Sequence, residues 1–320
     1  MEIKRKHYSV PLGPVDDRCF DSETLLRNSS WKLSAPESLS RESAMLAEWA
    51  ADSDHALGKY RHGIIDLPSV TELANEIRNQ LDNVYGVAWV SGFPVNKDLL
   101  PTSLLYLAIG AALGTVIETY GRLYDVIDQG DSYKDKAIPV SQTKQSTGMH
   151  TDSSRLHNVP DYVGLLCLHP AEQGGSSIIT SAAQAHEAVR YRDPELLKVL
   201  YRDYFRDVVT PGADRDISSI ADNKFPIFFF ENGLTMRYMR YWIETGHKLV
   251  GVPLGIEEIK AMNLLDEELS HKDHLFRFHL ARGDMLWVAN RVVAHDRDTY
   301  EEDADCPRWL LRQWVCRHSK

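Results

Sequence analysis

Two side chains that commonly bind metals lie two residues apart, shortly before an apolar segment. They are His150 and Asp152, in STGMHTDSS, and the apolar run YVGLLCL (162–168) follows them. In an extended chain, residues two apart project to the same face, so both side chains can point into one cavity. Two histidines and one carboxylate form an iron site that leaves positions open for a chelating co-substrate and O2. Such a site would need a second histidine from elsewhere in the chain.

The His-x-Asp triplet of residues 150–152 is not a specific signal by itself. With 13 histidines and 46 acidic residues in 320, about two His-x-Asp or His-x-Glu triplets are expected by chance, and the chain contains two. The other copy, His271 and Asp273, lies in the charged segment EELSHKDHLF, which we interpret as a solvated loop after a helix. The surrounding sequence therefore favours His150 and Asp152 as the candidate metal ligands.

The best candidate for the second histidine is His295, near the end of GDMLWVANRVVAHDR. The remote ligand should lie on or just after a late core strand, and this apolar segment is typical of one. A structural role is the alternative for a single histidine in such a place.

Two arginines in the last apolar segment indicate an anion near this site. In PRWLLRQWV, a strand would place Arg308, Leu310 and Arg312 on one face. Burying two guanidinium groups is costly unless each meets an anion, and their planar fork suits a carboxylate. A metal-chelating dicarboxylate would place its far carboxylate there. The alternative is that both arginines point into solvent.

Helical patterns dominate the first part of the chain and recur later. SVTELANEIRNQLDNV (69–84) opens with Ser69 and Glu72 at capping-box spacing and carries its apolar residues on one face. LLYLAIGAALG (104–114) is expected to be a helix that ends at Gly114. Two further helices are expected at about 183–203 and 256–269.

Strand patterns dominate from about residue 137. They include YVGLLCL, FPIFFF (225–230), two strands in 274–297 joined by an Arg-Gly-Asp turn, and RWLLRQWVC at the end. Helices followed by strands around a metal motif favour a β-sandwich or jelly roll with helical buttresses. We expect one domain over 1–320, with a partly helical N-terminal extension (1–85) and a β core with helical insertions (86–316).

Composition excludes several classes of protein. The net charge is −10 with no long basic run, which argues against a nucleic-acid partner. No apolar stretch is long enough to span a bilayer, and the N-terminus lacks the apolar core of a secretory signal. Cys19, Cys167, Cys306 and Cys316 lack metal-site spacing, so we expect reduced thiols and a cytoplasmic location.

Four segments occurring in this order resemble one family. GMHTD, YVGLLCLHPAEQGGSSIITS, GDMLWVANRVVAHDR and RWLLRQWV are similar to motifs of the taurine dioxygenase/TfdA-like family of Fe(II)- and 2-oxoglutarate-dependent oxygenases. Within that family, the chain resembles the branch containing clavaminate synthase-like amino-acid oxygenases, over roughly residues 85–316.

The resemblance implies a jelly-roll core and roles for individual residues. His150, Asp152 and His295 would bind iron, Arg308 would hold the far carboxylate of 2-oxoglutarate, and Ser177 in GGSS would assist it. Arg312 would meet an anionic group of the substrate. One departure from the family pattern is Asp296, where a glycine commonly follows the distal histidine. The implied reaction uses O2, converts 2-oxoglutarate to succinate and CO2, and oxidises an unactivated C–H bond.

Several alternatives stay open at this point. A halogenase is disfavoured because Asp152 fills the position that chloride would need. Hydroxylation of a small carboxylate-bearing substrate, in particular an amino acid or derivative, is expected, but the same scaffold can catalyse desaturation or cyclisation. A non-catalytic metal-binding jelly roll is the rival from another class. Residues 208–224 and 235–246 are candidates for a lid and a pocket wall. The sequence does not show whether the substrate is free or tethered to a carrier protein.

Overall fold

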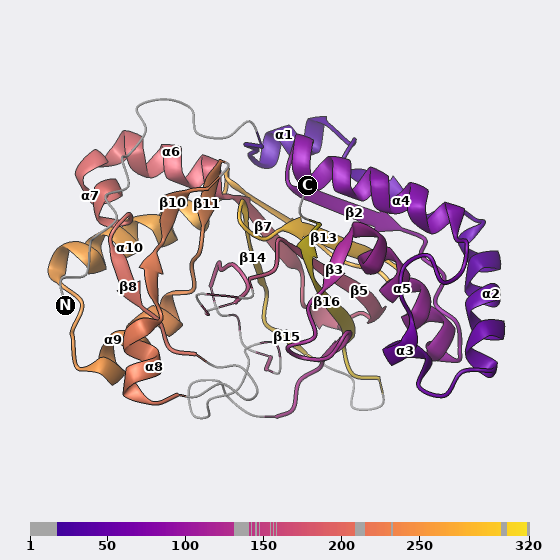
Figure 1. Cartoon of the computed structure of the whole chain (residues 1–320). Helices are drawn as coiled ribbons and strands as arrows, with labels where there is room; N and C mark the ends of the chain where they lie inside the picture. The colour runs from indigo at the N-terminus through magenta and orange to yellow at the C-terminus, as the bar shows by residue number, and fades with distance from the viewer. Residues whose placement is uncertain are drawn as a thin grey trace.

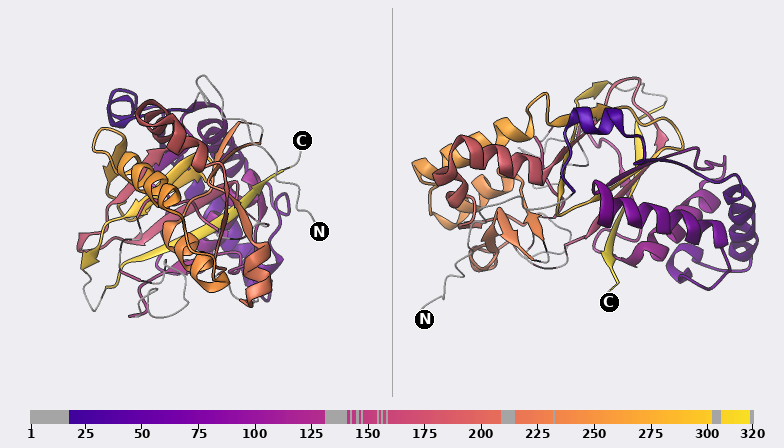
Figure 2. Two further views of the ribbon diagram at one scale, coloured as in Figure 1. Left: turned by 90° about the vertical axis from the view of Figure 1, so that its left-hand side faces the viewer. Right: turned by 90° about the horizontal axis from the view of Figure 1, so that it is seen from above.

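The computed structural model describes most of the chain, namely residues 18–130, 141, 143–144, 146, 148–153, 155, 157, 159–208, 215–231, 233–301 and 306–318. Two groups of helices lie on either side of a central region of strands (Figures 1 and 2). The described residues contain more helix than strand, so the expected mainly-β composition is met only in part.

The first group of helices precedes most of the strands and lies on the right of Figure 1. It comprises α1 (Ser22–Arg27), α2 (Leu39–Ala51), α3 (Ala56–Lys59), α4 (Pro68–Asn79), the π-helix η1 (Gln80–Val84) and α5 (Leu99–Leu113). The second group lies on the left and comprises α6 (Ala182–Arg192), α7 (Pro194–Val199), α8 (Ile217–Asp222), α9 (Arg240–Val250) and α10 (Ile256–Leu269).

A seven-stranded sheet forms the larger β layer. Its order is β1-β2-β13-β5-β16-β3, with β4 also pairing β16. The pairs are antiparallel except β1 with β2. The strands are β1 (Lys32–Ser34), β2 (Val87–Ser91), β3 (Gly114–Val116), β4 (Tyr124–Val126), β5 (Tyr162–His169), β13 (Met285–Ala289) and β16 (Trp309–Arg317).

A three-stranded antiparallel sheet in the order β12-β7-β14 forms a second layer. It consists of β12 (Leu275–Phe278), β7 (Ser177–Ser181) and β14 (Val293–Arg297). Three short antiparallel pairs complete the strands of the described residues: β6 (Gln173–Gly174) with β15 (Tyr300–Glu301), β8 (Asp203–Phe205) with β9 (Lys224–Pro226), and β10 (Phe228–Phe230) with β11 (Leu234–Met236).

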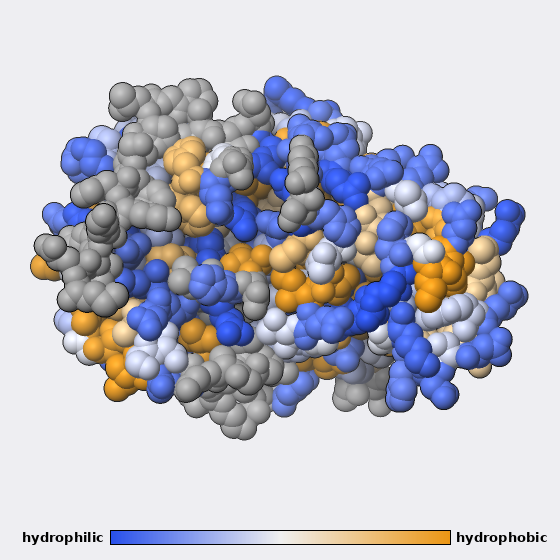
Figure 3. Space-filling model, viewed as in Figure 1, coloured by the Kyte–Doolittle hydropathy of each residue, from blue (hydrophilic) through white to orange (hydrophobic). Residues whose placement is uncertain are grey.

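Two apolar clusters hold these layers together. One joins α2, α4 and α5 to the seven-stranded sheet, and α5 is buried nearly all round, as its continuous apolar sequence requires. The other joins α6, α7 and α10 to β7, β11 and β14. The face shown in Figure 3 is largely hydrophilic, with apolar side chains in scattered areas. None of the helices in the described part of the chain combines the length and apolarity that a membrane crossing would take.

The helix expected at 69–84 is present as α4 followed by the π-helix η1, but its expected cap is wrong. Glu72 is exposed, and the carboxylate of Glu42 on α2 instead accepts hydrogen bonds from the Ser69 and Val70 amides at 2.7 and 2.9 Å. Pro68 occupies the first turn, where its missing N–H costs nothing. A carboxylate supplied from another helix therefore satisfies the free amides, because it can accept from two of them at once.

Three other expected elements are divided in the structure. The helix at 183–203 breaks into α6 and α7, because Pro194 cannot continue a helix and Asp193 caps the next one. The run at 225–230 forms β9 and β10 rather than one strand. The segment 274–297 contains three strands rather than two, since β14 follows β13 after a turn.

The end of α5 is confirmed at Gly114, which also begins β3. A Cβ atom at this position would lie 2.1 Å from the backbone oxygen of Cys316 on β16. Glycine is therefore required by the close approach of β3 and β16. The four cysteines form no disulfide among the described residues, as expected from their spacing.

Candidate metal centre

His150 and His295 are brought together by a backbone bridge. The amide of His150 donates to the carbonyl of His295 at 3.0 Å, and the amide of His295 donates to the carbonyl of His150 at 2.9 Å. The loop that precedes β5 thereby runs antiparallel to β14. This pairing places two imidazoles side by side, with ring centroids 4.6 Å apart, although 145 residues separate them.

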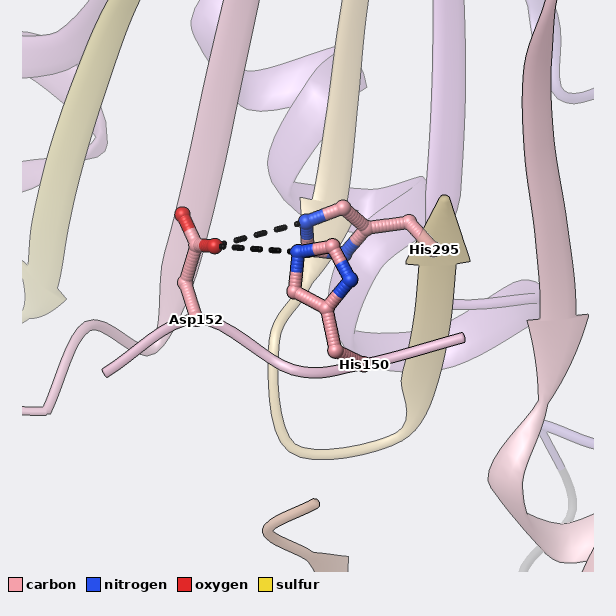
Figure 4. A group of neighbouring side chains, drawn as sticks. All are labelled: His150, Asp152 and His295. Atoms are coloured by element: carbon pink, nitrogen blue, oxygen red, sulfur yellow. Dashed lines mark ion pairs between the residues drawn. The ribbon is translucent and has the colours of Figure 1, made fainter. Parts of the chain in front are cut away.

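Asp152 completes a group of three ligating side chains (Figure 4). Its Oδ1 atom lies 3.8 Å from Nε2 of His150 and 3.5 Å from Nε2 of His295. One ligand atom from each residue lies within 4.8 Å of the others. Within the described residues, this is the one such group of three or more, whereas His271 and Asp273 lie exposed at the surface.

Hydrogen bonds orient the imidazole of His150 toward Asp152. Its Nδ1 atom lies 2.9 Å from the carbonyl oxygen of Gly148, which acts only as an acceptor. Nδ1 therefore carries the proton, and Nε2 keeps a lone pair that faces the group. Nδ1 of His295 is buried, and it has no hydrogen-bond partner among the described residues.

Asp152 is held by its side chain and by its backbone. Its Oδ2 atom accepts a hydrogen bond of 2.7 Å from the indole Nε1 of Trp314 and lies 3.4 Å from Nη1 of Arg312. The side chain of Asn290 accepts from the Asp152 amide at 2.7 Å and donates to its carbonyl at 3.0 Å. Trp314 and Asn290 were not among the residues expected at this site. Their only signal was their position in the segments that contain Arg312 and His295.

The electrostatics of the group suit a divalent cation. Burial and the neighbouring His295 lower the pKa of His150, so this imidazole is neutral near neutral pH. Burial would raise the pKa of Asp152, but its neighbours, above all the charged Arg312, outweigh it and hold that pKa well below its usual range. A neutral imidazole and an ionised carboxylate are the forms that bind metals. With both histidine Nε2 atoms turned toward Asp152, these three residues fit an iron ion.

Arg308 lies next to a cavity of about 290 Å³. The cavity walls include Cys167, Gly175, His279 and Leu310. The guanidinium is buried, and its Nη1 atom has no hydrogen-bond partner among the described residues. Burial and the nearby Arg297 lower the pKa of Arg308 to about 10, which leaves it charged at neutral pH. A buried cationic donor beside a cavity fits an anionic ligand.

Ser177 lies at the start of β7, between Phe278 on β12 and Arg297 on β14. It is buried. The preceding Gly174 and Gly175 have φ angles of 73° and 69°, which glycine adopts readily. These two glycines lie between β6 and β7, and Gly175 lies close to the Arg308 side chain.

Arg312 meets a carboxylate of the protein itself. Its guanidinium approaches Asp152 and packs over the rings of Tyr120, Tyr124 and Trp314, at 5.3, 4.7 and 4.8 Å. The family resemblance implied an anionic group of the substrate as the partner of Arg312. The structure provides a distant acidic residue, and that residue is a member of the candidate metal centre.

One of the two segments expected near a substrate is attached to the metal centre. Tyr238, in the expected pocket wall, exchanges two hydrogen bonds with Thr151: its carbonyl accepts from the Thr151 amide at 2.8 Å, and its amide donates to Oγ1 of Thr151 at 3.0 Å. The other segment, the expected lid, includes α8, and its residues 209–214 lie outside the described residues.

Residues 52–314 match the model of the family described as taurine catabolism dioxygenase TauD, TfdA family. Among curated proteins, a uridine-5'-phosphate dioxygenase from a Streptomyces species is 28% identical over 193 residues, covering 54% of this chain and 63% of that protein. Dioxygenase str8 from Strobilurus tenacellus is 22% identical over 245 residues, covering 71% and 51%. The matched region therefore spans about half to two thirds of the length of these relatives.

Solved oxygenase structures share the fold. Asparagine oxygenase AsnO superposes with a TM-score of 0.67 at 16% identity, covering 90% of this chain and 93% of that one. The non-heme iron oxygenase OrfP, in complex with Fe and alpha-ketoglutaric acid, gives a TM-score of 0.62 at 16% identity, covering 89% and 94%. At these identities the likeness shows a common fold.

Proposed function

Because the chain belongs to the TauD/TfdA dioxygenase family, we propose that it is an Fe(II)- and 2-oxoglutarate-dependent dioxygenase. One observation carries the proposal. Two histidines and one aspartate form a group in which the carboxylate is ionised and His150 is neutral. The same molecule contains a buried arginine beside a cavity, and one donor of this arginine has no hydrogen-bond partner among the described residues. A protein that binds only a metal does not require a buried cation of this kind, which is costly to bury.

In this proposal, His150, Asp152 and His295 hold Fe(II), and Arg308 binds the far carboxylate of 2-oxoglutarate, assisted by Ser177. The bound iron would supply the activation of O2. Overall, 2-oxoglutarate would lose CO2 and take up one oxygen atom to give succinate, and the other oxygen atom would enter the oxidised product. The residues of the chain place the co-substrate and keep the ligands in their binding forms. Asp152 stays ionised chiefly because the guanidinium of Arg312 favours its charge.

The substrate is a small carboxylate-bearing molecule, an amino acid or a derivative, and hydroxylation is the reaction. Two structures of the same fold support this class, since one contains 3-hydroxyasparagine and another (3S)-hydroxy-L-Arg. One guanidinium nitrogen of Arg312 contacts Asp152, so the other nitrogens can donate hydrogen bonds to a substrate carboxylate. Desaturation or cyclisation on the same scaffold is the second candidate. The dioxygenase named for uridine-5'-phosphate supports a wider range of substrates in the family.

The proposed architecture of the core is a double-stranded β-helix. The three-stranded sheet and the seven-stranded sheet without β1 are its two layers, within residues 86–316. The helices α1–α4 lie in the N-terminal extension, and the whole chain acts as one oxygenase domain. A cytoplasmic location stays a prediction from the cysteine pattern.

Anaerobic addition of Fe(II) and 2-oxoglutarate tests the proposal directly. We expect one Fe(II) per chain and the weak visible charge-transfer band of the chelate. His150→Ala and Asp152→Ala should each abolish the band and turnover, while circular dichroism shows a retained fold. His271→Ala is the control, because it changes the exposed copy of the triplet. An undiminished band in both site variants would contradict the assignment.

A turnover assay distinguishes an enzyme from a metal-binding protein. We expect succinate to form from 2-oxoglutarate in the presence of Fe(II) and O2, with faster formation when the correct amino acid is added. Screening amino acids by mass spectrometry for a gain of one oxygen identifies the substrate. A protein that binds Fe(II) and 2-oxoglutarate but never forms succinate would favour the binding role.

A further inference from the structure

The two oxygens of the Asp152 carboxylate have different surroundings. Oδ1 faces the two histidines, and Oδ2 faces the seven-stranded sheet, where Trp314 and Arg312 contact it. We propose that Trp314 is a positioning residue that makes Asp152 a one-oxygen ligand of the metal. This inference rests on the proposed function, because it concerns the same metal centre.

The indole is suited to this task by its chemistry. Its Nε1–H group only donates, so it cannot compete for the metal, and it carries no charge that would repel a cation. The bond to Oδ2 is 2.7 Å long, joins a donor to an ionised acceptor and lies in a buried place. Such charge-assisted bonds are short and strong. The Arg312 contact is longer, at 3.4 Å, and supplies mainly charge.

Trp314 is itself held in place on three sides. Tyr120 packs edge-on against its ring, with centroids 5.0 Å apart and an angle of 87° between the planes. The guanidinium of Arg312 covers the ring at 4.8 Å. The backbone of Trp314 lies opposite Val163 of β5, and the Trp314 carbonyl accepts a hydrogen bond from the Ile117 amide at 2.8 Å. An indole fixed in this way can fix the torsion of the carboxylate that it contacts.

One-oxygen binding by Asp152 determines how many coordination positions stay open on the metal. If Oδ2 turned to the metal beside Oδ1, the carboxylate would occupy one position more. A chelating co-substrate and O2 together need three open positions. By holding Oδ2, Trp314 preserves all three. Loss of the indole N–H should therefore weaken metal binding and, at saturating metal, weaken the binding of the chelating co-substrate as well.

The strand that carries Trp314 also provides a matched control. Trp309, on the same strand, donates its indole N–H to Oδ1 of Asp125 at 2.7 Å, away from the metal centre. Trp314→Phe and Trp309→Phe thus each remove one Trp–Asp hydrogen bond from β16. Fe(II) affinity is measured anaerobically by competition with a chelator, and 2-oxoglutarate affinity by the charge-transfer band at saturating Fe(II).

We expect Trp314→Phe to raise the Fe(II) dissociation constant about 10-fold to 100-fold and to raise that of 2-oxoglutarate at saturating iron. Trp309→Phe should change neither. Wild-type affinities in Trp314→Phe, or an equal loss of Fe(II) affinity in Trp309→Phe, would overturn the inference. Absence of Fe(II) binding by the wild-type protein would instead overturn the proposed function.

A second measurement does not require the Trp314 variant to fold. In protein labelled with ¹⁵N-tryptophan, Asp152→Ala should move one indole N–H resonance toward the position of a free indole. Asp125→Ala should move a different one, that of Trp309. If Asp152→Ala moves no indole resonance, the hydrogen bond does not exist in solution and the inference is wrong.

Discussion

At the scale of residues, two arginines four positions apart meet different surroundings. Arg312 contacts Asp152 and three aromatic rings, whereas Arg308 keeps a buried Nη1 atom without a partner among the described residues and lies beside a cavity. Both are costly to bury. The protein compensates the charge of Arg312 itself, and the charge of Arg308 calls for a ligand.

Arg308→Ala should therefore raise the 2-oxoglutarate requirement steeply. Losing a charge-assisted contact to a buried carboxylate costs about 2–4 kcal/mol, or about thirty-fold to several-hundred-fold in affinity. Arg308→Lys should rescue only in part, since lysine cannot form the planar fork. Titrating the chelate band with 2-oxoglutarate measures the effect, with Arg202→Ala, which removes an exposed ion pair, as the control. Unchanged affinity would move the anion site away from Arg308.

Arg312→Gln should separate cofactor binding from substrate binding. Trp314 still holds Asp152 in this variant, so the chelate band should persist. If Arg312 binds a substrate carboxylate, the C–H bond is no longer aimed correctly, and succinate should form without matching product. The ratio of succinate to oxidised substrate is the measurement. A wild-type ratio would show that Arg312 has a structural role only and would remove the main support for an amino-acid substrate.

At the scale of elements, one helix supplies the cap of another. The buried carboxylate of Glu42 on α2 accepts from the first free amides of α4, those of Ser69 and Val70. Four amides at a helix start lack partners within the helix, and a carboxylate there also interacts favourably with the helix dipole. The contact fixes how α2 and α4 pack against each other and against α5.

Glu42→Gln should destabilise the fold by about 2 kcal/mol. In this variant an NH2 group replaces one carboxylate oxygen. This group would face the Val70 N–H as donor against donor, and the negative charge would be lost. Urea unfolding monitored by circular dichroism measures the change. Glu48→Gln, on the exposed side of the same helix, is the matched control and should change stability by less than about 0.5 kcal/mol. Equal stability of the two variants would show that the cap contributes nothing.

At the scale of the whole molecule, the candidate metal centre joins the two sheets. His295 lies on β14 of the three-stranded sheet, and His150 is bridged to it by its backbone. Asp152 is held by Trp314 and Arg312, which lie on β16 of the seven-stranded sheet. A metal bound by all three residues would therefore link the layers.

Binding of metal and co-substrate should stabilise the folded protein. A ligand present at 100 times its dissociation constant adds about 2.7 kcal/mol, which corresponds to a rise of several degrees in Tm. Thermal unfolding with and without Fe(II) and 2-oxoglutarate under anaerobic conditions measures this, and a chelator should reverse it. Asp152→Ala should show no rise. An equal rise in that variant would place the binding site elsewhere.

The sequence by itself determined the features that depend on local pattern. The apolar period of 69–84 predicted its helix, because one face of a helix repeats within a few residues. The spacing of His150 and Asp152 placed both on one side of an extended segment, and a late apolar segment indicated His295. The structure brings these three side chains together.

Only the tertiary structure decided the contacts that span long stretches of chain. Arg312 and Trp314 reach Asp152 across 160 and 162 residues, because β16 pairs with β5 and β5 follows the loop that carries His150 and Asp152. The cap from Glu42 depends on how α2 packs against α4. Strand order and helix packing follow from burial summed over the whole chain, and no local period encodes them. The partners of the site residues could therefore be found only in the fold.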